Sequence, residues 1–441
     1  MSLTRPTLAA VVGFRGWRAL RYRNYRLFFS GQLVSLIGTW MQSVAQGWLV
    51  LQLTGDPIYL GLVAVAQFTP VLILGLFGGV LADVLPKRQT LIVTQTAAMA
   101  LAFVLFFLTI TNNVTVLHVL VLALLLGCVN AVDMPTRQAF GVEMVGRGDI
   151  GNAVALNSAV FNGARVVGPA LAGLVIGATS IAVAFLVNGL SFVAVIVAYA
   201  RMDQASLTCA PRLTSANTVS GVMTHLRVGL AYTRATPAIL VPIVVIGLVS
   251  GFGMNFGVLI PPLARDVLHV GATGYGFLMA ATGVGSLIAA LSIAFGRRNR
   301  LAYIGLGAAL AGVAELVLAA SGSYALSLVA MFATGLGAIG MAATANTTIQ
   351  LTVPDELRGR VMSVYTTVFA GSTPIGGLMA GAMASALGVQ EAIAIGAGLT
   401  LVVGLATIAW YRRDGAIRRA SQAGAAAGAA PEAVRRSSVP G

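Results

Sequence analysis

The chain has 441 residues, of which 58% are hydrophobic and only 9% are charged. A soluble domain is about a quarter charged, so this composition excludes an ordinary soluble enzyme or nucleic-acid-binding module. The net charge of +14 at pH 7 therefore needs another explanation, which the positions of the basic residues supply.

Twelve apolar runs follow one another, each long enough for a membrane-spanning helix of about 20 residues. They cover 25–53, 58–82, 89–111, 114–139, 151–176, 179–200, 237–262, 272–295, 301–321, 323–348, 359–386 and 389–411. The sequence thus predicts an all-α integral membrane protein. Its expected parts are a basic cytoplasmic head (1–24), an N-terminal six-helix half (25–200), a cytoplasmic linker with a candidate amphipathic helix (201–235), a C-terminal six-helix half (236–411) and a disordered cytoplasmic tail (412–441).

Basic residues are confined almost entirely to one side of this twelve-span arrangement. All but two of the 27 lysines and arginines lie in the head, the tail and the loops of that side; the exceptions are Arg265, on the other side, and Arg165, inside a run. Because cytoplasmic segments are enriched in basic residues, we expect both termini in the cytoplasm. The bias explains the net charge without nucleic acid, and it suits contact with anionic membrane lipid.

The two halves carry matching residues at an offset of 208 positions. Gly163 then falls on Gly371, and Gly173 on Gly381. Several such matches in one block indicate a duplicated six-span unit, which is typical of transporters built from parallel repeats.

The loop after the second span reads Gly79-Val80-Leu81-Ala82-Asp83-Val84-Leu85-Pro86-Lys87-Arg88. It resembles the loop signature of the major facilitator superfamily, although Val84 and Pro86 replace an arginine and a glycine of that signature. Two further stretches, 162–173 in the fifth span and 354–363 before the eleventh, resemble exporters of the same superfamily. Together these features resemble its drug and siderophore exporter branch, that of the enterobactin exporter family.

This resemblance implies two pseudo-symmetric six-helix halves that work by alternating access in a plasma membrane, here a bacterial inner membrane. The implied activity is proton-driven efflux of a small organic molecule, either drug-like or siderophore-like. An uptake symporter or facilitator of the same fold is an alternative, and a channel or non-transporting receptor is an alternative of another class. We expect no cofactor, no metal site and no enzymatic activity, because the three histidines are scattered and no catalytic cluster is present.

The resemblance further implies a cytoplasmic gate. Asp83 is expected to accept hydrogen bonds at the N-terminus of the eleventh span, where free backbone N–H groups favour a carboxylate. Lys87 is expected to bridge Asp83 to Asp133. The alternative is a solvated turn with ordinary cytoplasmic charges. The expected gate residues are Gly79, Asp83, Lys87, Arg88, Asp133, Arg358 and Gly359.

A stripe of polar residues runs along the first span at alternating steps of three and four, which places them on one helix face. Such a stripe avoids lipid, so it either lines a cavity or forms hydrogen bonds between helices. The candidate substrate-cavity residues are Gln32, Ser35, Thr39, Gln42, Gln46, Asn162, Arg165, Asn255 and Tyr365.

Small residues and prolines mark the fifth and eleventh spans. Glycine allows close helix approach, and proline removes a backbone donor and permits bending, so packing and hinge roles are both open. These candidates are Gly163, Gly168, Pro169, Gly173, Gly371, Pro374, Gly377 and Gly381.

Ionisable residues inside spans are costly and mark functional sites by default. Arg165 is the only base deep in a span, and either a gating or an anion-attracting role fits it. Asp133 and Glu315 are the candidates for proton coupling, with a purely structural role for Asp133 as the alternative.

Overall fold

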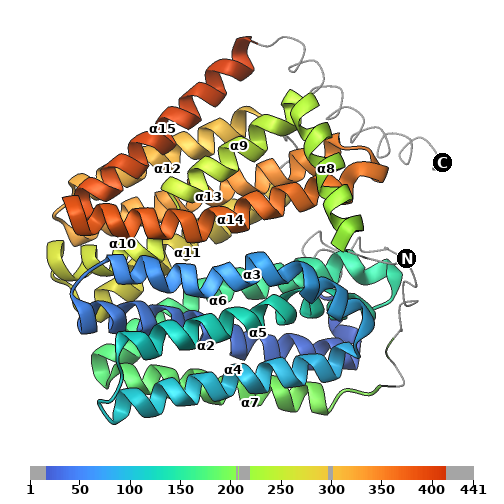
Figure 1. Cartoon of the computed structure of the whole chain (residues 1–441), viewed down its shortest axis with the longest axis horizontal. Helices are drawn as coiled ribbons and strands as arrows, with labels where there is room; N and C mark the ends of the chain where they lie inside the picture. Colours follow the sequence, from blue (N-terminus) through green and yellow to red (C-terminus); the bar gives the residue numbers. More distant parts are fainter. Residues whose placement is uncertain (1–15, 205–206, 208–218, 296–300, 414–441) are drawn as a thin grey trace, which may run out of the picture. The chain divides into compact units, whose positions relative to one another are not determined.

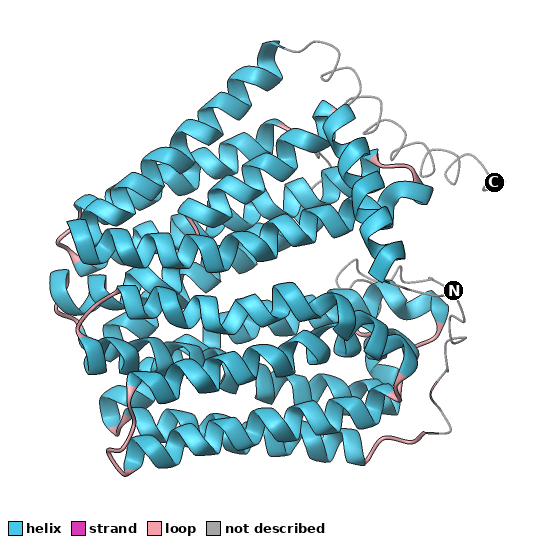
Figure 2. Ribbon diagram, viewed as in Figure 1, coloured by secondary structure: helices cyan, strands magenta, loops and turns pink. Residues whose placement is uncertain are grey.

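The computed structural model describes residues 16–204, 207, 219–295 and 301–413. Within these ranges the secondary structure consists of helices joined by short turns, without a strand (Figure 2). Most of the expected basic head, part of the linker and nearly all of the expected tail lie outside the described residues.

The chain divides into two compact units. Unit 1 comprises Met1–Leu53 and Thr69–Ser215, and unit 2 comprises Thr54–Phe68 and Ala216–Gly441. The first turns of the second span thus group with unit 2, although the expected N-terminal half runs unbroken from 25 to 200.

The first six long helices are coloured blue to green in Figure 1. In chain order the elements of this part are η1 (Arg18–Arg21), α2 (Arg23–Thr54), α3 (Ile58–Val84), α4 (Lys87–Ile110), α5 (Val116–Glu143), η2 (Arg147–Asp149), α6 (Ile150–Ala178) and α7 (Ile181–Ala200).

The turns between these helices follow from local sequence. Gly55 has a φ of 69°, a conformation that glycine adopts freely, and it separates α2 from α3. The start of α5 is a capping box, in which the Thr115 side chain accepts from the His118 backbone and the His118 ring accepts from the Thr115 backbone.

A cluster of aromatic side chains forms the core of unit 1. Phe28 lies 6.5 Å from Phe140 and 6.3 Å from Tyr199, measured between ring centroids, and all three residues are buried. This cluster joins α2, α5 and α7, which carry the polar residues of the candidate site.

The second part of the chain begins with a further helix, α8, at the end of the linker (Figure 1). The expected amphipathic segment falls within it. The elements are α8 (Val219–Ala235), α9 (Pro237–Phe252), α10 (Phe256–Pro262), η3 (Leu263–Val267), α11 (Gly271–Phe295), α12 (Ala302–Ala320), α13 (Tyr324–Thr352), α14 (Asp355–Leu387) and α15 (Val389–Arg413).

The seventh apolar run, expected as one helix, is interrupted. Helix α9 ends at Phe252, and α10 begins at Phe256 and continues into the π-helical turn η3. Pro261 and Pro262 lie at the junction of α10 and η3, and because proline lacks an N–H group it cannot close the regular bonds of an α-helix.

Close backbone contacts hold the helices of unit 2 together. A Cβ atom on Gly335 of α13 would lie 2.1 Å from the Thr282 carbonyl oxygen of α11, and one on Gly312 of α12 would lie 2.6 Å from the Leu401 nitrogen of α15. Lipid tails are as apolar as leucine, so membrane helices associate mainly through close packing of this kind.

Ten helical segments of the described chain are long and apolar enough to cross a membrane. The other two long helices, α2 and α14, have 32 and 33 residues but contain more polar side chains. Large apolar side chains such as Val93, Phe107 and Val402 are more than half exposed, as contact with lipid requires. The chain is therefore an all-helical, multi-pass integral membrane protein.

Candidate functional site

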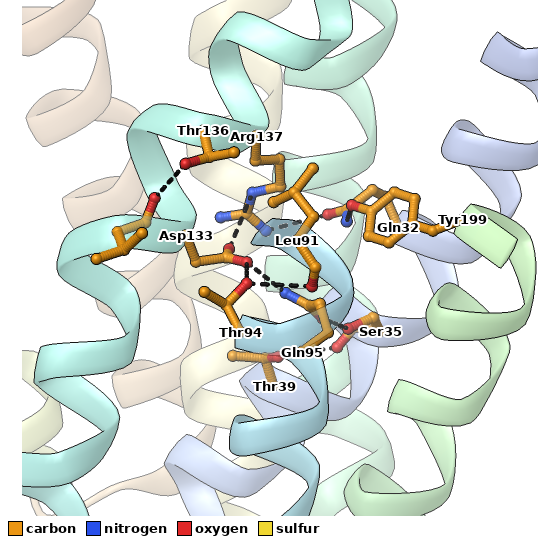
Figure 3. Close-up of polar contacts among 11 residues, drawn as sticks. Gln32, Ser35, Thr39, Leu91, Thr94, Gln95, Asp133, Thr136, Arg137 and Tyr199 are labelled. Carbon is orange, nitrogen blue, oxygen red and sulfur yellow. Dashed lines mark hydrogen bonds and ion pairs between the residues drawn. The ribbon is translucent and has the colours of Figure 1, made fainter. Parts of the chain in front are cut away.

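An ion pair lies buried in unit 1, on α5. The side chain of Asp133 is only 3% exposed, and its Oδ2 lies 3.7 Å from Nε of Arg137, one helical turn further on (Figure 3). The Thr94 hydroxyl and the Gln95 amide of α4 each donate a hydrogen bond of 2.8 Å to Oδ1. Both carboxylate oxygens are therefore engaged, as a buried charge requires.

The ion pair extends into a network that reaches two further helices. Arg137 donates from Nη1 to Oε1 of Gln32 on α2 at 3.0 Å, and Gln32 donates from Nε2 to the Tyr199 hydroxyl of α7 at 2.7 Å. Ser35 on α2 donates to Oε1 of Gln95 at 3.5 Å. Figure 3 shows these side chains converging from α2, α4, α5 and α7. The network ties the four helices together and keeps the Asp133 carboxylate away from water.

The loop signature has a different ion pair from the expected one. Lys87 contacts Glu143 at the end of α5, with Nζ 2.7 Å from Oε1, and both side chains are less than a sixth exposed. Asp133 lies ten residues before Glu143, about 15 Å along the helix axis, so it is paired with Arg137 instead. The expected bridge from Lys87 to Asp133 is therefore wrong.

The neighbouring Arg88 caps a helix. It donates from Nε to the Tyr199 carbonyl at 2.6 Å and from Nη2 to the Ala200 carbonyl at 2.7 Å, at the C-terminal end of α7. A guanidinium at this position neutralises the carbonyls that a helix end leaves free.

Of the other expected gate residues, Arg358 has partners that lie close to it in sequence. Arg358 pairs with Asp355 at 2.5 Å and donates to the Gln350 carbonyl at 3.0 Å. Gly79 and Gly359 lie in open space, because no heavy atom comes within 4 Å of a Cβ built on either. The side chain of Asp83 is outside those described, so its docking stays a prediction.

Most of the first-span stripe is bonded between helices. Gln32, Ser35, Gln42 and Gln46 are buried, and Gln42 accepts a hydrogen bond of 2.6 Å from Asn188 on α7. Together with the bonds of Gln32 and Ser35, this favours the hydrogen-bonding interpretation of the stripe over cavity lining.

Thr39 is the stripe residue that the structure leaves exposed. Its hydroxyl donates back to the Ser35 carbonyl at 2.9 Å, within the same helix.

Arg165 on α6 lies over an aromatic ring. Its Cζ is 5.6 Å from the centroid of Trp40, whose ring in turn meets Phe161 edge to face at 5.8 Å. No ion pair or hydrogen bond joins the guanidinium to any residue that the structure describes. Asn162, another cavity candidate on the same helix, donates a hydrogen bond to the Ser158 carbonyl at 2.8 Å.

The candidates of unit 2 are separate from one another. Asn255 donates to the Gly251 carbonyl at 2.8 Å across the break after α9. Tyr365 donates to the Ala342 carbonyl at 3.4 Å and stacks on Phe369, with the rings 6.3 Å apart. Glu315 is buried on α12, with 4% of its surface exposed.

Several of the candidate glycines lie at close contacts. A Cβ on Gly168 would lie 2.5 Å from Cβ of Trp40, one on Gly377 would lie 3.0 Å from Cβ of Ala64, and one on Gly381 would lie 2.8 Å from the Pro57 carbonyl oxygen.

The remaining candidates of this group differ in burial. Gly163 has open space around it, whereas Gly173 is buried and Gly371 half-buried. Pro169 and Pro374 are both buried within their helices. The contacts of the other glycines support a packing role, and the hinge role stays a prediction.

Sequence reasoning missed four members of the network, namely Thr94, Gln95, Arg137 and Tyr199. Arg137 counts as a loop charge in the positive-inside analysis, because it lies near the end of an apolar run. The available signal is its spacing of four residues from Asp133, the distance at which opposite charges meet on a helix.

The comparisons with known proteins agree on a transporter. A family model described as transmembrane secretion effector matches residues 15–423. The staphyloferrin A transporter of Staphylococcus aureus (strain NCTC 8325 / PS 47) is 25% identical, over 84% of this chain and 92% of its own. The multidrug efflux pump Tap of Mycolicibacterium fortuitum is 28% identical, with 82% and 90% covered.

Solved structures share the fold at low sequence identity. A peptide transporter POT superposes with a TM-score of 0.72 at 14% identity, over 90% of this chain and 95% of its own. A bacterial homologue of the human lysosomal transporter Spinster superposes with a TM-score of 0.68 at 13% identity, over 91% and 97%.

Proposed function

Because the chain belongs to the transmembrane secretion effector family of major facilitator transporters, we propose that it exports a small organic molecule. Export proceeds by alternating access and is driven by a proton gradient. The family description supports secretion, and the relatives named staphyloferrin A transporter and multidrug efflux pump Tap support a siderophore-like or drug-like substrate.

The orientation follows from the distribution of charge. Since nearly all basic residues lie on one side of the twelve expected spans, the proposed orientation has both termini in the cytoplasm of a bacterium whose inner membrane holds the protein. In this orientation Asp83 stands at the cytoplasmic end of α3, where it docks on the N-terminus of α14 and closes the gate in one state of the cycle.

The main support for the proposed substrate site is Arg165, an arginine within a membrane span. A guanidinium inside a membrane span is costly, and it is retained where a partner compensates the charge. Among the described residues its contact is the ring of Trp40, and a cation–π contact leaves the five N–H donors free. A carboxylate or other anionic group of the substrate fits this fork, and the Trp40 and Phe161 rings offer an apolar surface to the rest of the molecule.

The other exposed polar groups nearby complete the proposed contacts. Thr39 is exposed and Asn162 half-buried, whereas the buried amides of Gln32 and Gln42 form hydrogen bonds to other helices. In this proposal the Asp133 network acts structurally, by keeping α2, α4, α5 and α7 together while the two halves rearrange.

The experiment is uptake into inverted, energised membrane vesicles from a panel of dyes, drugs and siderophore-like compounds, with and without a protonophore. We expect at least one anionic compound to accumulate and to be lost when the protonophore is added. Arg165→Gln should reduce this accumulation at least tenfold, since a lost charge-assisted pair amounts to more than about 1.4 kcal/mol. The matched control, Arg413→Gln, changes an exposed arginine at the end of α15 and should transport normally.

Two results would contradict the proposal. Saturable counterflow that is insensitive to the protonophore would identify a facilitator and remove the proton drive. Normal transport of every compound by Arg165→Gln would remove Arg165 from the substrate site. Flux without saturation or counterflow would indicate a channel, and binding without flux would indicate a receptor.

A further inference from the structure

A second ionisable residue lies buried within a span, in unit 2. Glu315 is on α12, one turn from the end of the helix at Ala320, and only 4% of its surface is exposed. No ion pair or hydrogen bond to its carboxyl group is present in the described part of the chain. An isolated buried carboxylate costs several kcal/mol, so a positive charge is needed to compensate it.

Neighbouring helices do not supply that charge. Helices α9, α10 and α13 carry no ionisable acidic or basic residue, as their sequences show. The charged residues of α15 are Glu391, Arg412 and Arg413, and all three are exposed at its two ends.

Glu315 faces a small cavity. Its lining includes Phe252 and Gly253 at the end of α9, Phe256 of α10 and Ile393 of α15, and it has room for about one water-sized species.

A second unsatisfied oxygen lies beside this cavity. The Thr400 hydroxyl of α15 is fully buried and has no hydrogen-bond partner within the described residues. A Cβ on Gly253 would lie 2.5 Å from the Thr400 Oγ1 and 3.4 Å from Oε2 of Glu315, so the two oxygens flank the same point.

The interrupted span adds negative potential at this place. Helix α9 ends at Phe252, and the carbonyls of Phe252 and Gly253 accept no backbone hydrogen bond from the described residues. The C-terminal end of a helix carries a partial negative charge of about half an elementary charge. A carboxylate beside such an end is unfavourable unless a cation lies between them.

We propose that the cavity between Glu315, Thr400 and the C-terminal end of α9 binds one monovalent cation, either a proton or Na⁺. A carboxylate, a hydroxyl and free carbonyls are the oxygen ligands that a hard cation takes, and the carboxylate alone suffices for a proton. Resting on the proposed export, this site holds the coupling ion. Asp133 is unsuited to that role, since Arg137, Thr94 and Gln95 already occupy both of its oxygens.

The test measures binding to the purified full-length protein in detergent, without substrate. In the first arm, infrared difference spectra at neutral pH compare wild type with Glu315→Gln in search of the carbonyl stretch of a protonated carboxylic acid. In the second arm, the unfolding temperature is followed as NaCl replaces choline chloride at constant ionic strength. Glu391→Gln is the matched control, because it makes the same change at an exposed position of α15.

A protonated-acid band that disappears in Glu315→Gln but not in Glu391→Gln identifies a proton site. A rise of the unfolding temperature with Na⁺ that is lost only in Glu315→Gln identifies a sodium site. If folded wild-type protein gives neither signal, the proposal is overturned. Should Glu315→Gln fail to fold, Gly253→Ala replaces it, because the added methyl group fills the cavity without altering the acid, and it should abolish the Na⁺ response or shift the band.

Because no transport is measured, a failure of this site and a failure of the proposed export are distinguishable. Binding without protonophore-sensitive transport would retain the cation site and reject the export. Transport without either binding signal would retain the export and place the coupling ion elsewhere.

Discussion

Replacing Asp133 by asparagine is the sharpest test of the buried network. The change preserves shape but replaces one carboxylate oxygen by an NH₂ group. If the amide oxygen keeps the bonds from Thr94 and Gln95, the NH₂ group faces the guanidinium of Arg137, donor against donor. If the amide turns round, it faces the two α4 donors instead.

Either orientation loses favourable contacts, and the size of the loss can be estimated. Hydrogen bonds between membrane helices contribute about 0.6 kcal/mol on average and up to about 1.7 kcal/mol. One amide orientation loses the contact with Arg137, and the other loses the two hydrogen bonds from Thr94 and Gln95. In either case we expect the unfolding free energy to fall by about 2 kcal/mol. Arg137→Met leaves the Asp133 carboxylate without its ion-pair partner, and we expect it to lower the unfolding free energy by about 3 kcal/mol.

The double variant tests whether the two side chains act as a pair. In Asp133→Asn/Arg137→Met the amide NH₂ faces an apolar side chain, so the donor clash is removed. We therefore expect a loss smaller than the sum of the single losses by about 1–2 kcal/mol.

Equilibrium unfolding in mixed micelles with an increasing fraction of dodecyl sulfate, followed by circular dichroism, measures these free energies. Asp266→Asn is the control, because Asp266 is exposed and its partner Arg265 is partly exposed, and it should change stability by less than about 0.5 kcal/mol. Single losses that add within about 0.5 kcal/mol, or a loss for Asp133→Asn no larger than that of the control, would refute the account of the network.

Two further predictions concern packing and capping. Gly335→Ala should lower the unfolding free energy by about 2 kcal/mol, because the added Cβ would meet the Thr282 carbonyl oxygen. Gly398 has open space around it, so Gly398→Ala should be neutral or stabilising by up to about 1 kcal/mol through helix propensity. Equal effects of the two substitutions in the same unfolding assay would contradict this prediction. Arg88→Met should lower the unfolding free energy by about 1–2 kcal/mol, because the final carbonyls of α7 lose their donor, and deuterium exchange of the α7 amides should become faster. Arg413→Met, at an exposed position at the end of α15, should do neither.

Hydropathy predicts the positions of the long helices well, because a bilayer demands apolar runs of one length. The differences lie at the ends: α5 continues to Glu143 and α13 to Thr352, beyond the apolar runs expected to end at 139 and 348. The helical turns outside the hydrocarbon region are polar, so a search for apolar runs does not include them.

The candidate site was predicted less completely, for a reason that the first span illustrates. Helical spacing places Gln32 and Gln42 on one polar face, but spacing alone does not say whether that face meets a cavity or another helix. Their partners, Tyr199 and Asn188, lie more than 140 residues away in sequence, so only the tertiary structure brings them together.

The interruption of the seventh span has a mechanical consequence. A continuous helix transmits an axial displacement along its whole length, because each turn is bonded to the next. Between Phe252 and Phe256 that continuity is lost, so α10 can tilt by rotation about three residues while α9 keeps its contacts with α14 and α15. Any force that moves α10 therefore strains a short stretch of backbone and not a whole helix, and unit 2 gains a joint within one of its spans.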